Sequence, residues 1–462
     1  MNRFTQKLDA FFGVTKSGSS FKKELIGGIS AYLAMAYIIF VNPSVLGDAG
    51  MDHDAVFAST IFGAATATLI MGLYAKFPLG LASCMSMNAF FAYSVVLGTG
   101  LSWQEALSCV LVSSVIFLAL SYSGIRFKIL EAIPEVLKNA GSVGLGLFIA
   151  FIGMKNSHII ISDPSTMIKI GDFSDPNFII AGCGIIFLAI LLTKKNKNAV
   201  IFSMIFAMVV GLLLGVLNSN GLIHFTEEQA ATLPHLSGNL IALPTTPINA
   251  MMSQTFGVAF INIPKIMTVS GITIVLTFTF LDFFGTAATL NAATSEMRNF
   301  NIDTSENKRI YVSDALGSFF GSIFGTSNIT TYIESVSGIV QGARTGLMAV
   351  VVAILFLLSL FLHPFLSLFT SAVTAPALVA IGIFMFKNVS TIQWQNNFEE
   401  TIPAFLTIVL MPLTGSIALG LTIGFVFHTI LMVAAKRKNE VHTYMYYVTI
   451  VSIIYIASVA LS

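Results

Sequence analysis

Three polar side chains lie inside strongly apolar stretches of this chain. Asp282 lies in TFTFLDFFGTAATL, Glu334 in GTSNITTYIES and Asn88 in SCMSMNAFFAY. A carboxylate at the centre of a membrane costs about 2.5–3.5 kcal/mol on insertion scales, so it must face a partner or water. Carboxylates accept hydrogen bonds, and an amide both donates and accepts them. These residues predict a site for a small polar solute or protons. A structural hydrogen bond between helices is the alternative for Asp282.

The residues before Glu334 do not favour a helix. Residues 325–331, GTSNITT, combine a glycine and β-branched residues with side chains that compete for backbone hydrogen bonds. They predict an extended segment followed by a short half-helix, whose first amides can donate to a ligand. Residues 80–86, before Asn88, are similarly small and irregular, and paired interruptions of this kind indicate a transporter site. We expect further side chains to line it: Ser86, Phe283, Thr330 and Thr331.

Two other ionisable residues in apolar stretches have weaker claims to a function. Asp314 lies near the inner end of its span, where gating and simple hydration explain it equally well. His428 is interpreted as a packing residue with its hydrogen bonds satisfied rather than as a proton relay. Cys84, Cys109 and Cys183 show no CxxC spacing, so they predict neither disulfides nor a metal site. No hydrolase motif is present, and we expect neither a cofactor nor an enzymatic activity.

The composition places these residues in a membrane. Of the 462 residues, 55% are hydrophobic and 10% charged, against about 25% charged in soluble domains. The net charge of +1 does not suggest a nucleic-acid partner. Apolar stretches recur at the length of about 20 residues that a helix needs to cross a bilayer. We expect an all-α polytopic protein with about fourteen spans. They lie near residues 26–43, 55–75, 79–97, 103–123, 139–155, 177–193, 198–218, 266–290, 311–326, 328–341, 345–363, 367–386, 401–414 and 415–436.

Basic residues occupy every second loop between these spans. This pattern predicts a cytoplasmic N-terminus in a bacterial inner membrane, with the lipid bilayer as a partner. The first 20 residues are polar and basic and do not resemble a cleavable signal. A last apolar stretch, residues 444–461, is either an additional span or an interfacial helix. The predicted inner loops contain Lys76, Arg126, Lys194, Lys195, Lys197, Arg298, Arg344, Lys387 and Lys436.

Four blocks carry a family resemblance: VNPSVLGDAGM, MNAFFAY, GTSNITTYIESVSG and GARTGLMAVVVA. They resemble the AzgA-like purine permeases, in the superfamily that also contains uracil permease and the xanthine/urate carriers. The resemblance runs from about residue 24 to residue 435, and the block 325–347 is its most specific part. It implies two inverted seven-span repeats, a core and a gate domain, and a short strand near mid-membrane in each half.

The resemblance also implies a function and a division of the chain. A purine base (adenine, guanine or hypoxanthine) would bind Asn88, Asp282 and Glu334 between core and gate and enter by proton symport through Glu334 and Asp282. Whether the protein forms a homodimer is left open by the sequence. The expected parts are a cytoplasmic segment 1–25, repeats 26–218 and 266–436, an extracytoplasmic connection 219–265 and a C-terminal segment 437–462.

The chain departs from the family pattern at the edges of the pocket. The second acid of the family's DxFDTxGTL motif is Gly285 here, so we expect weaker proton coupling, or coupling only at lower external pH. The other departures are Ala34, Ser83, Cys84, Ser86 and Ala288. They leave two alternatives open: a carrier of another small polar or anionic solute on the same fold, and a purine sensor without transport. Two carboxylates disfavour an anion because like charges repel.

Overall fold

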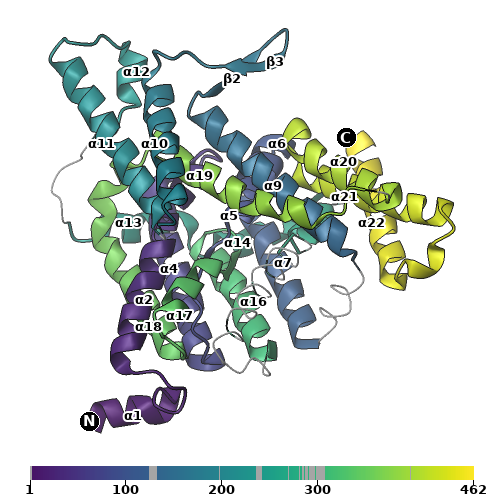
Figure 1. Cartoon of the computed structure of the whole chain (residues 1–462), viewed down its shortest axis with the longest axis horizontal. Helices are drawn as coiled ribbons and strands as arrows, with labels where there is room; N and C mark the ends of the chain where they lie inside the picture. The colour runs from purple at the N-terminus through teal and green to yellow at the C-terminus, as the bar shows by residue number, and fades with distance from the viewer. Residues whose placement is uncertain are drawn as a thin grey trace.

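The computed structural model describes residues 3–123, 133–196, 198–235, 242–268, 270–279, 281, 282, 286, 290, 297, 307–395 and 397–461. This part of the chain is predominantly helical, as predicted, and Figure 1 shows the arrangement of the helices. Nine of the described helices are long and apolar enough to cross a membrane, and each coincides with a predicted span. They are Phe21–Gly47, His53–Ala75, Trp103–Ser123, Glu135–Asn156, Pro176–Thr193, Ala199–Ser219, Gly346–Leu368, Ser371–Thr391 and Ile417–Ala434.

The five other predicted spans are shorter, interrupted or only partly described. Helices α16 (Asn307–Phe324) and α20 (Phe398–Thr414) cover two of them. A helix at Ser270–Thr279 covers the described start of the span predicted at 266–290. The remaining two are the interrupted spans, and each contains a short strand.

The two interrupted spans meet through these strands. Strand β1 (Leu81–Ser83) leads into helix α5 (Met85–Ala89), and β4 (Ile329–Thr331) leads into a 3₁₀ turn and helix α17 (Val336–Val340). The strands pair antiparallel, with Ala82 opposite Thr330. Backbone hydrogen bonds from Cys84 N to Asn328 O (2.8 Å) and from Tyr332 N to Gly80 O (3.0 Å) extend the ladder at both ends. The predicted extended segments and half-helices are thus confirmed.

The helices pack into two groups, which we name after the core and gate domains that the family resemblance implies. In the core group, α4 (His53–Ile70) packs against α3 (Ile38–Gly47), α16 and α18 (Gly346–Leu358). Helix α7 (Trp103–Ser123) packs on α16. Helix α2 (Phe21–Met35) packs on α17 and α18. In the gate group, α9 (Glu135–Asn156) packs on α19 (Ser371–Phe386) and α20. Helices α10 (Pro176–Thr193), α11 (Ala199–Ser219) and α21 (Ile417–Ala434) complete the gate group.

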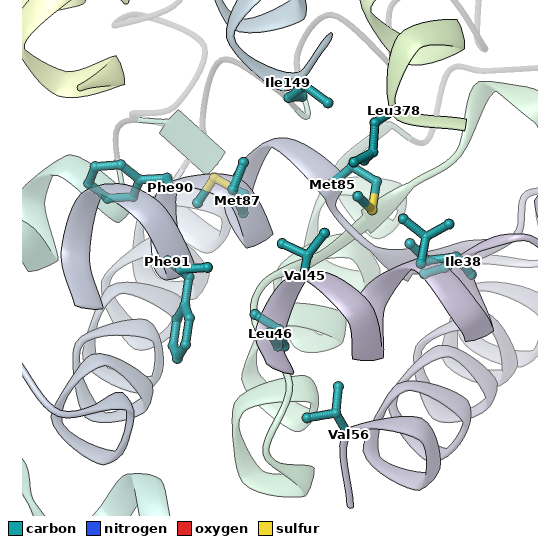
Figure 2. Close-up of a cluster of buried hydrophobic side chains, with 14 of the residues drawn as sticks. Ile38, Val45, Leu46, Val56, Met85, Met87, Phe90, Phe91, Ile149 and Leu378 are labelled. Atoms are coloured by element: carbon teal, nitrogen blue, oxygen red, sulfur yellow. The ribbon is translucent and has the colours of Figure 1, made fainter. Parts of the chain in front are cut away.

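The two groups meet across an apolar contact. Figure 2 shows Ile38 of α3 and Met85 of α5 near Leu378 of α19, with Ile149 of α9 close by. All four side chains are buried. The contact is therefore made largely by dispersion and hydrophobic burial, which are not directional.

The predicted connection 219–265 contains packed structure that the sequence did not indicate. Its first part holds α12 (Glu227–Ala231), which begins with a capping box formed by Thr226 and Gln229. Further on lie α13 (Thr245–Ala250), a π-helical turn at Met251–Thr255, α14 (Val258–Ile261) and a 3₁₀ turn at Ile263–Ile266. Ser108 Oγ donates to Ala259 O (2.7 Å), and the Ser59 and Thr255 hydroxyls are 2.9 Å apart. The end of this segment therefore belongs to the packed core rather than to an open loop.

Short elements mark the two ends of the molecule. Helix α1 (Arg3–Phe12) lies beside the end of the first helix pair, where Lys76 Nζ is 4.3 Å from the centre of the Phe11 ring. A hairpin of β2 (Ile160–Asp163) and β3 (Met167–Ile170) projects at the opposite end, as Figure 1 shows.

Candidate functional site

The crossing of β1 and β4 brings Asn88 into contact with both interrupted spans. Asn88 lies in α5, is fully buried, and its Oδ1 accepts from Ser83 Oγ (3.0 Å) and from Ser327 Oγ. Tyr332 Oη donates to the backbone oxygen of Ser83 (2.6 Å). The first half-helix is thus connected by side chains to the segment that precedes the second.

Asp282 contacts the same segment from another helix. Its Oδ2 accepts from Asn328 Nδ2 (2.8 Å) and Ser318 Oγ (3.1 Å), and its Oδ1 accepts from Thr286 Oγ1 (3.2 Å). The side chain is almost fully buried. Asn328 directly follows Ser327, the partner of Asn88, so the two predicted residues converge on one short stretch of backbone. The structural hydrogen bond considered for Asp282 is present in this conformation.

Glu334 differs from Asp282 because it is only half-buried. Its Oε1 accepts from Tyr37 Oη (3.2 Å), and the rings of Tyr37 and Tyr332 are 6.4 Å apart. Tyr37 lies in the break between α2 and α3. The broken first span thus contacts the start of the second half-helix through the hydrogen bond from Tyr37 to Glu334. The carboxylate of Glu334 remains partly accessible.

Of the two interpretations of Asp314, gating and simple hydration, hydration was wrong, because the side chain is fully buried. Its side chain is fully buried, and its Oδ1 accepts from both the backbone N (2.9 Å) and Oγ1 (3.1 Å) of Thr331. A buried carboxylate needs such partners because the bilayer core supplies no water. Asp314 therefore holds β4 against α16, and Thr331 turns its hydroxyl toward α16.

The other predicted lining residues have different surroundings. Thr330 is buried within β4, whereas Ser86 is half-buried in the first turn of α5, with its hydroxyl 3.0 Å from Cys84 Sγ. Ser86 and the partly exposed Cys84 thus mark the start of the first half-helix. Phe283, together with the departures Gly285 and Ala288, lies outside the described residues.

The structure adds Asn42, which the sequence did not single out. Its Nδ2 donates to Thr60 Oγ1 (2.7 Å) and Thr326 Oγ1 (2.9 Å), and Thr326 Oγ1 is 3.2 Å from Ser83 Oγ. Asn42 is fully buried, and its Oδ1 has no hydrogen-bond partner among the described residues. The available signal was an amide within an apolar stretch, the same signal that identified Asn88. Asn42 anchors the segment between α16 and β4 to the broken first span.

His428 lies in α21, away from these residues in the core group. It is buried, as expected of a packing residue. The expectation that its hydrogen bonds are satisfied was wrong for one atom, because Nδ1 has no partner in the described part of the chain. Among the described residues, no group of three or more His, Cys, Asp or Glu side chains is placed to hold a metal ion.

Comparisons with known proteins cover nearly the whole chain. A model of the Permease family matches residues 22–455. The guanine/hypoxanthine permease PbuG of Bacillus subtilis is 40% identical over 97% of this chain and 99% of its own length. The adenine permease AdeP of Escherichia coli is 30% identical over 94% of this chain and 92% of its own length.

Solved structures show the same helical fold at much lower identity. The transmembrane domain of the cyanobacterial bicarbonate transporter BicA has a TM-score of 0.59 at 14% identity, over 87% of this chain and 96% of that domain. Murine Slc26a9, an anion transporter in the inward-facing state, has a TM-score of 0.58 at 12% identity, over 94% of this chain and 73% of its own. At this identity the likeness shows the fold alone.

Proposed function

The chain belongs to the Permease family, whose members are membrane transporters rather than enzymes, and from this premise we propose that it imports a purine nucleobase. Relatives at 30–40% identity include permeases that are named for guanine and hypoxanthine or for adenine. The observation that carries the proposal is the convergence of Asn88 and Asp282 on residues 327 and 328, with Glu334 just beyond β4.

The chemistry of these groups fits the edge of a purine. A purine presents ring N–H donors beside ring-nitrogen acceptors, and Glu334 offers a partly accessible carboxylate to the donors. Asp282 is oriented by Asn328 and Ser318, so in this role it acts on the base directly or through Asn328. A solute that left these buried groups unpaired would lose about 1–3 kcal/mol per group, and this loss provides selectivity.

Transport requires the site to open alternately to the two sides of the membrane. We place the base where α3 and α5 face α9 and α19, because the half-helix begins there and the contact is apolar. A non-directional contact allows one group to move along the other without first breaking many hydrogen bonds. The two interrupted spans are consistent with inverted repeats at 26–218 and 266–436, a bacterial inner-membrane location and a cytoplasmic N-terminus, which we propose as well.

An anion carrier is the second candidate, because BicA and Slc26a9 have this fold. Asp282 and Glu334 argue against it, since an anion at the half-helix starts would meet two carboxylates.

Purified protein can be screened by thermal shift against purines, pyrimidines, nucleosides and bicarbonate. A ligand that binds only the folded state raises apparent stability with its occupancy. We expect stabilisation by a purine base. Stabilisation by bicarbonate alone would overturn the proposal, and purine binding without radiolabelled uptake would identify a sensor.

Proton symport is proposed as the driving force, with Glu334 as the accessible carboxylate and Asp282 as the second candidate. Since Gly285 replaces a family acid, we expect purine uptake to need a lower external pH than in relatives that retain it. Restoring the acid by Gly285→Asp should move the pH optimum of uptake upward, and Gly285→Asn is the uncharged control. Strong proton-driven uptake at pH 7 to 8 that is unchanged by Gly285→Asp would contradict a role for the missing acid.

A further inference from the structure

The last helix, α22 (Thr443–Leu461), has the length and composition of a membrane span. Its 19 residues include no charged side chain. At 1.5 Å per residue the helix is about 28 Å long, close to the hydrocarbon thickness of about 30 Å. Nothing in its sequence therefore prevents it from crossing the bilayer completely.

Helix α22 returns alongside α21 after a short turn. The two helices pack on each other, and the hydroxyls of Thr429 and Thr449 are 2.6 Å apart and buried. Met445 and Ser452 lie on the same buried side of α22. A polar contact of this kind between neighbouring helices is a common feature of membrane interiors.

The opposite side of α22 is apolar and open. Ile450, Ile453 and Ile454 are 54%, 50% and 56% exposed. An interfacial helix needs a polar or charged face toward water and an apolar face toward lipid. In α22 the hydroxyls of Thr449 and Ser452 face the protein, and the apolar side chains face outward. A helix that lies on the membrane surface would need its polar side chains to face water instead.

The residues at the start of α22 mark one membrane surface. Lys436, Arg437 and Lys438 precede it, and no lysine or arginine follows residue 438. The first turns carry three tyrosines, a residue type enriched at the membrane–water boundary: Tyr444, Tyr446 and Tyr447. The start of α22 therefore carries the residue types that are typical of a membrane surface.

From these observations we infer that α22 crosses the membrane as an additional span, so that the two termini lie on opposite sides. The exposed face of α22 then contacts lipid hydrocarbon, and its buried face supports α21 of the gate group. This inference does not depend on the transported solute.

Three single-cysteine variants of the full-length protein test the inference. Lys7→Cys, Asn439→Cys and Ser462→Cys are made in a background without Cys84, Cys109 and Cys183, and intact cells are treated with a membrane-impermeant maleimide. Lys7 and Asn439 are exposed, so substitution there leaves the core unchanged. In intact cells, we expect the cysteines at positions 7 and 439 to be either both labelled or both unlabelled. The cysteine at position 462 should behave in the opposite way, and all three should be labelled after permeabilisation.

Position 439 is the internal control because it precedes α22 by only a few residues. If positions 439 and 462 label from the same side, α22 does not cross and the inference is wrong. An epitope appended after Ser462 of the otherwise unaltered protein gives an independent readout. Antibody access in intact spheroplasts should agree with the result at position 462. Because neither readout uses purine uptake, failure of the proposed function would leave this result unaffected.

Discussion

The three carboxylates in the membrane interior have different environments, and these environments separate their roles. Asp314 is fully buried and accepts two hydrogen bonds from Thr331, so it holds a strand in place. Asp282 accepts from three side chains, those of Thr286, Ser318 and Asn328. Glu334 is half-buried, and Tyr37 Oη donates a hydrogen bond to its Oε1. Among the three, Glu334 is therefore the carboxylate best placed to exchange a protein hydrogen bond for one from a solute.

Replacing Glu334 by glutamine should weaken purine binding while leaving the protein inserted and folded. A hydrogen bond to a charged group contributes about 1.5–3 kcal/mol, so we expect roughly 10- to 150-fold weaker binding. Binding is measured by titration of purified protein, and uptake in cells that produce equal amounts of each variant. Glu400→Gln, in the first turn of α20, is a matched control that should bind purine like the natural protein. Normal uptake by Glu334→Gln at normal abundance would remove Glu334 from the site.

Asp314→Ala should reduce stability, because it leaves the buried N–H of Thr331 without its acceptor. A buried donor without a partner costs about 1–3 kcal/mol. Asp314→Asn keeps an acceptor oxygen in the same place and should retain most of the stability. Thermal unfolding in detergent measures both variants. Equal stability of Asp314→Ala and the natural protein would show that the contact with β4 contributes nothing.

At the scale of the elements, the crossing of β1 and β4 explains why both spans are interrupted. Two helices could not pair their backbones at this point, whereas two extended segments can, and the pairing satisfies groups that the bilayer cannot hydrate. The close approach also requires a small residue: a Cβ at Gly80 would lie 2.7 Å from Met35 Sδ. The irregular residues 80–86 and 325–331 are therefore a requirement of the crossing rather than weakly formed helix.

A second junction joins the core and gate groups near the predicted outer surface. Asp48 follows α3, Tyr93 lies in the π-helical turn after α5, and Asn156 ends α9. Asp48 Oδ2 accepts from Tyr93 Oη (2.6 Å) and from Asn156 Nδ2 (2.6 Å), and Asn156 Nδ2 is 2.9 Å from Tyr93 Oη. These polar contacts are directional, unlike the apolar contact beneath them, so they should resist opening toward the outside.

Asn156→Ala should therefore favour the outward-open state. The loss of a hydrogen bond worth about 0.5–1.5 kcal/mol changes a two-state population by roughly 2- to 12-fold. Cys84, at the start of α5, reports this change in a background without Cys109 and Cys183. An impermeant maleimide added to intact cells should label it faster in the variant. Asn220→Ala, at the exposed end of α11, is the control. Equal labelling rates in Asn156→Ala and its parent would show that this junction does not hold the outer side closed.

At the scale of the whole molecule, the distribution of charge is the basis for the proposed orientation in the membrane. Basic residues gather at the ends of the helices that the proposed topology places in the cytoplasm, such as Lys194 after α10 and Lys436 after α21. Acidic residues gather at the other end, in the hairpin of β2 and β3 and the turn that follows it. This separation follows the positive-inside rule over the length of the chain.

Cysteine labelling in intact cells checks this orientation. Lys195→Cys should not react with an impermeant reagent, whereas Asp172→Cys should react, because they lie at opposite ends of α10. Both should react after the cells are permeabilised. The reverse pattern would invert the proposed topology and place the N-terminus outside.

The sequence alone determined the membrane class, the nine long spans and the position of both interruptions. These depend on local properties: apolar length, charge at helix ends, and residues that compete with helical hydrogen bonds. The same reasoning selected Asn88, Asp282 and Glu334, because an amide or carboxylate in an apolar stretch is costly wherever the chain folds.

Only the tertiary structure decided what those residues contact. Hydration was one of two interpretations of Asp314, because its neighbours along the chain place it near a helix end, but α16 faces β4, and Thr331 supplies its donors. Asn42 and Tyr37 act across the molecule, on Thr326 and Glu334, and no local pattern predicts such distant pairs. The packed segment at 245–266 likewise follows from contacts with α4 and α7. Local chemistry determines which residues need partners, whereas the fold determines which partners they find.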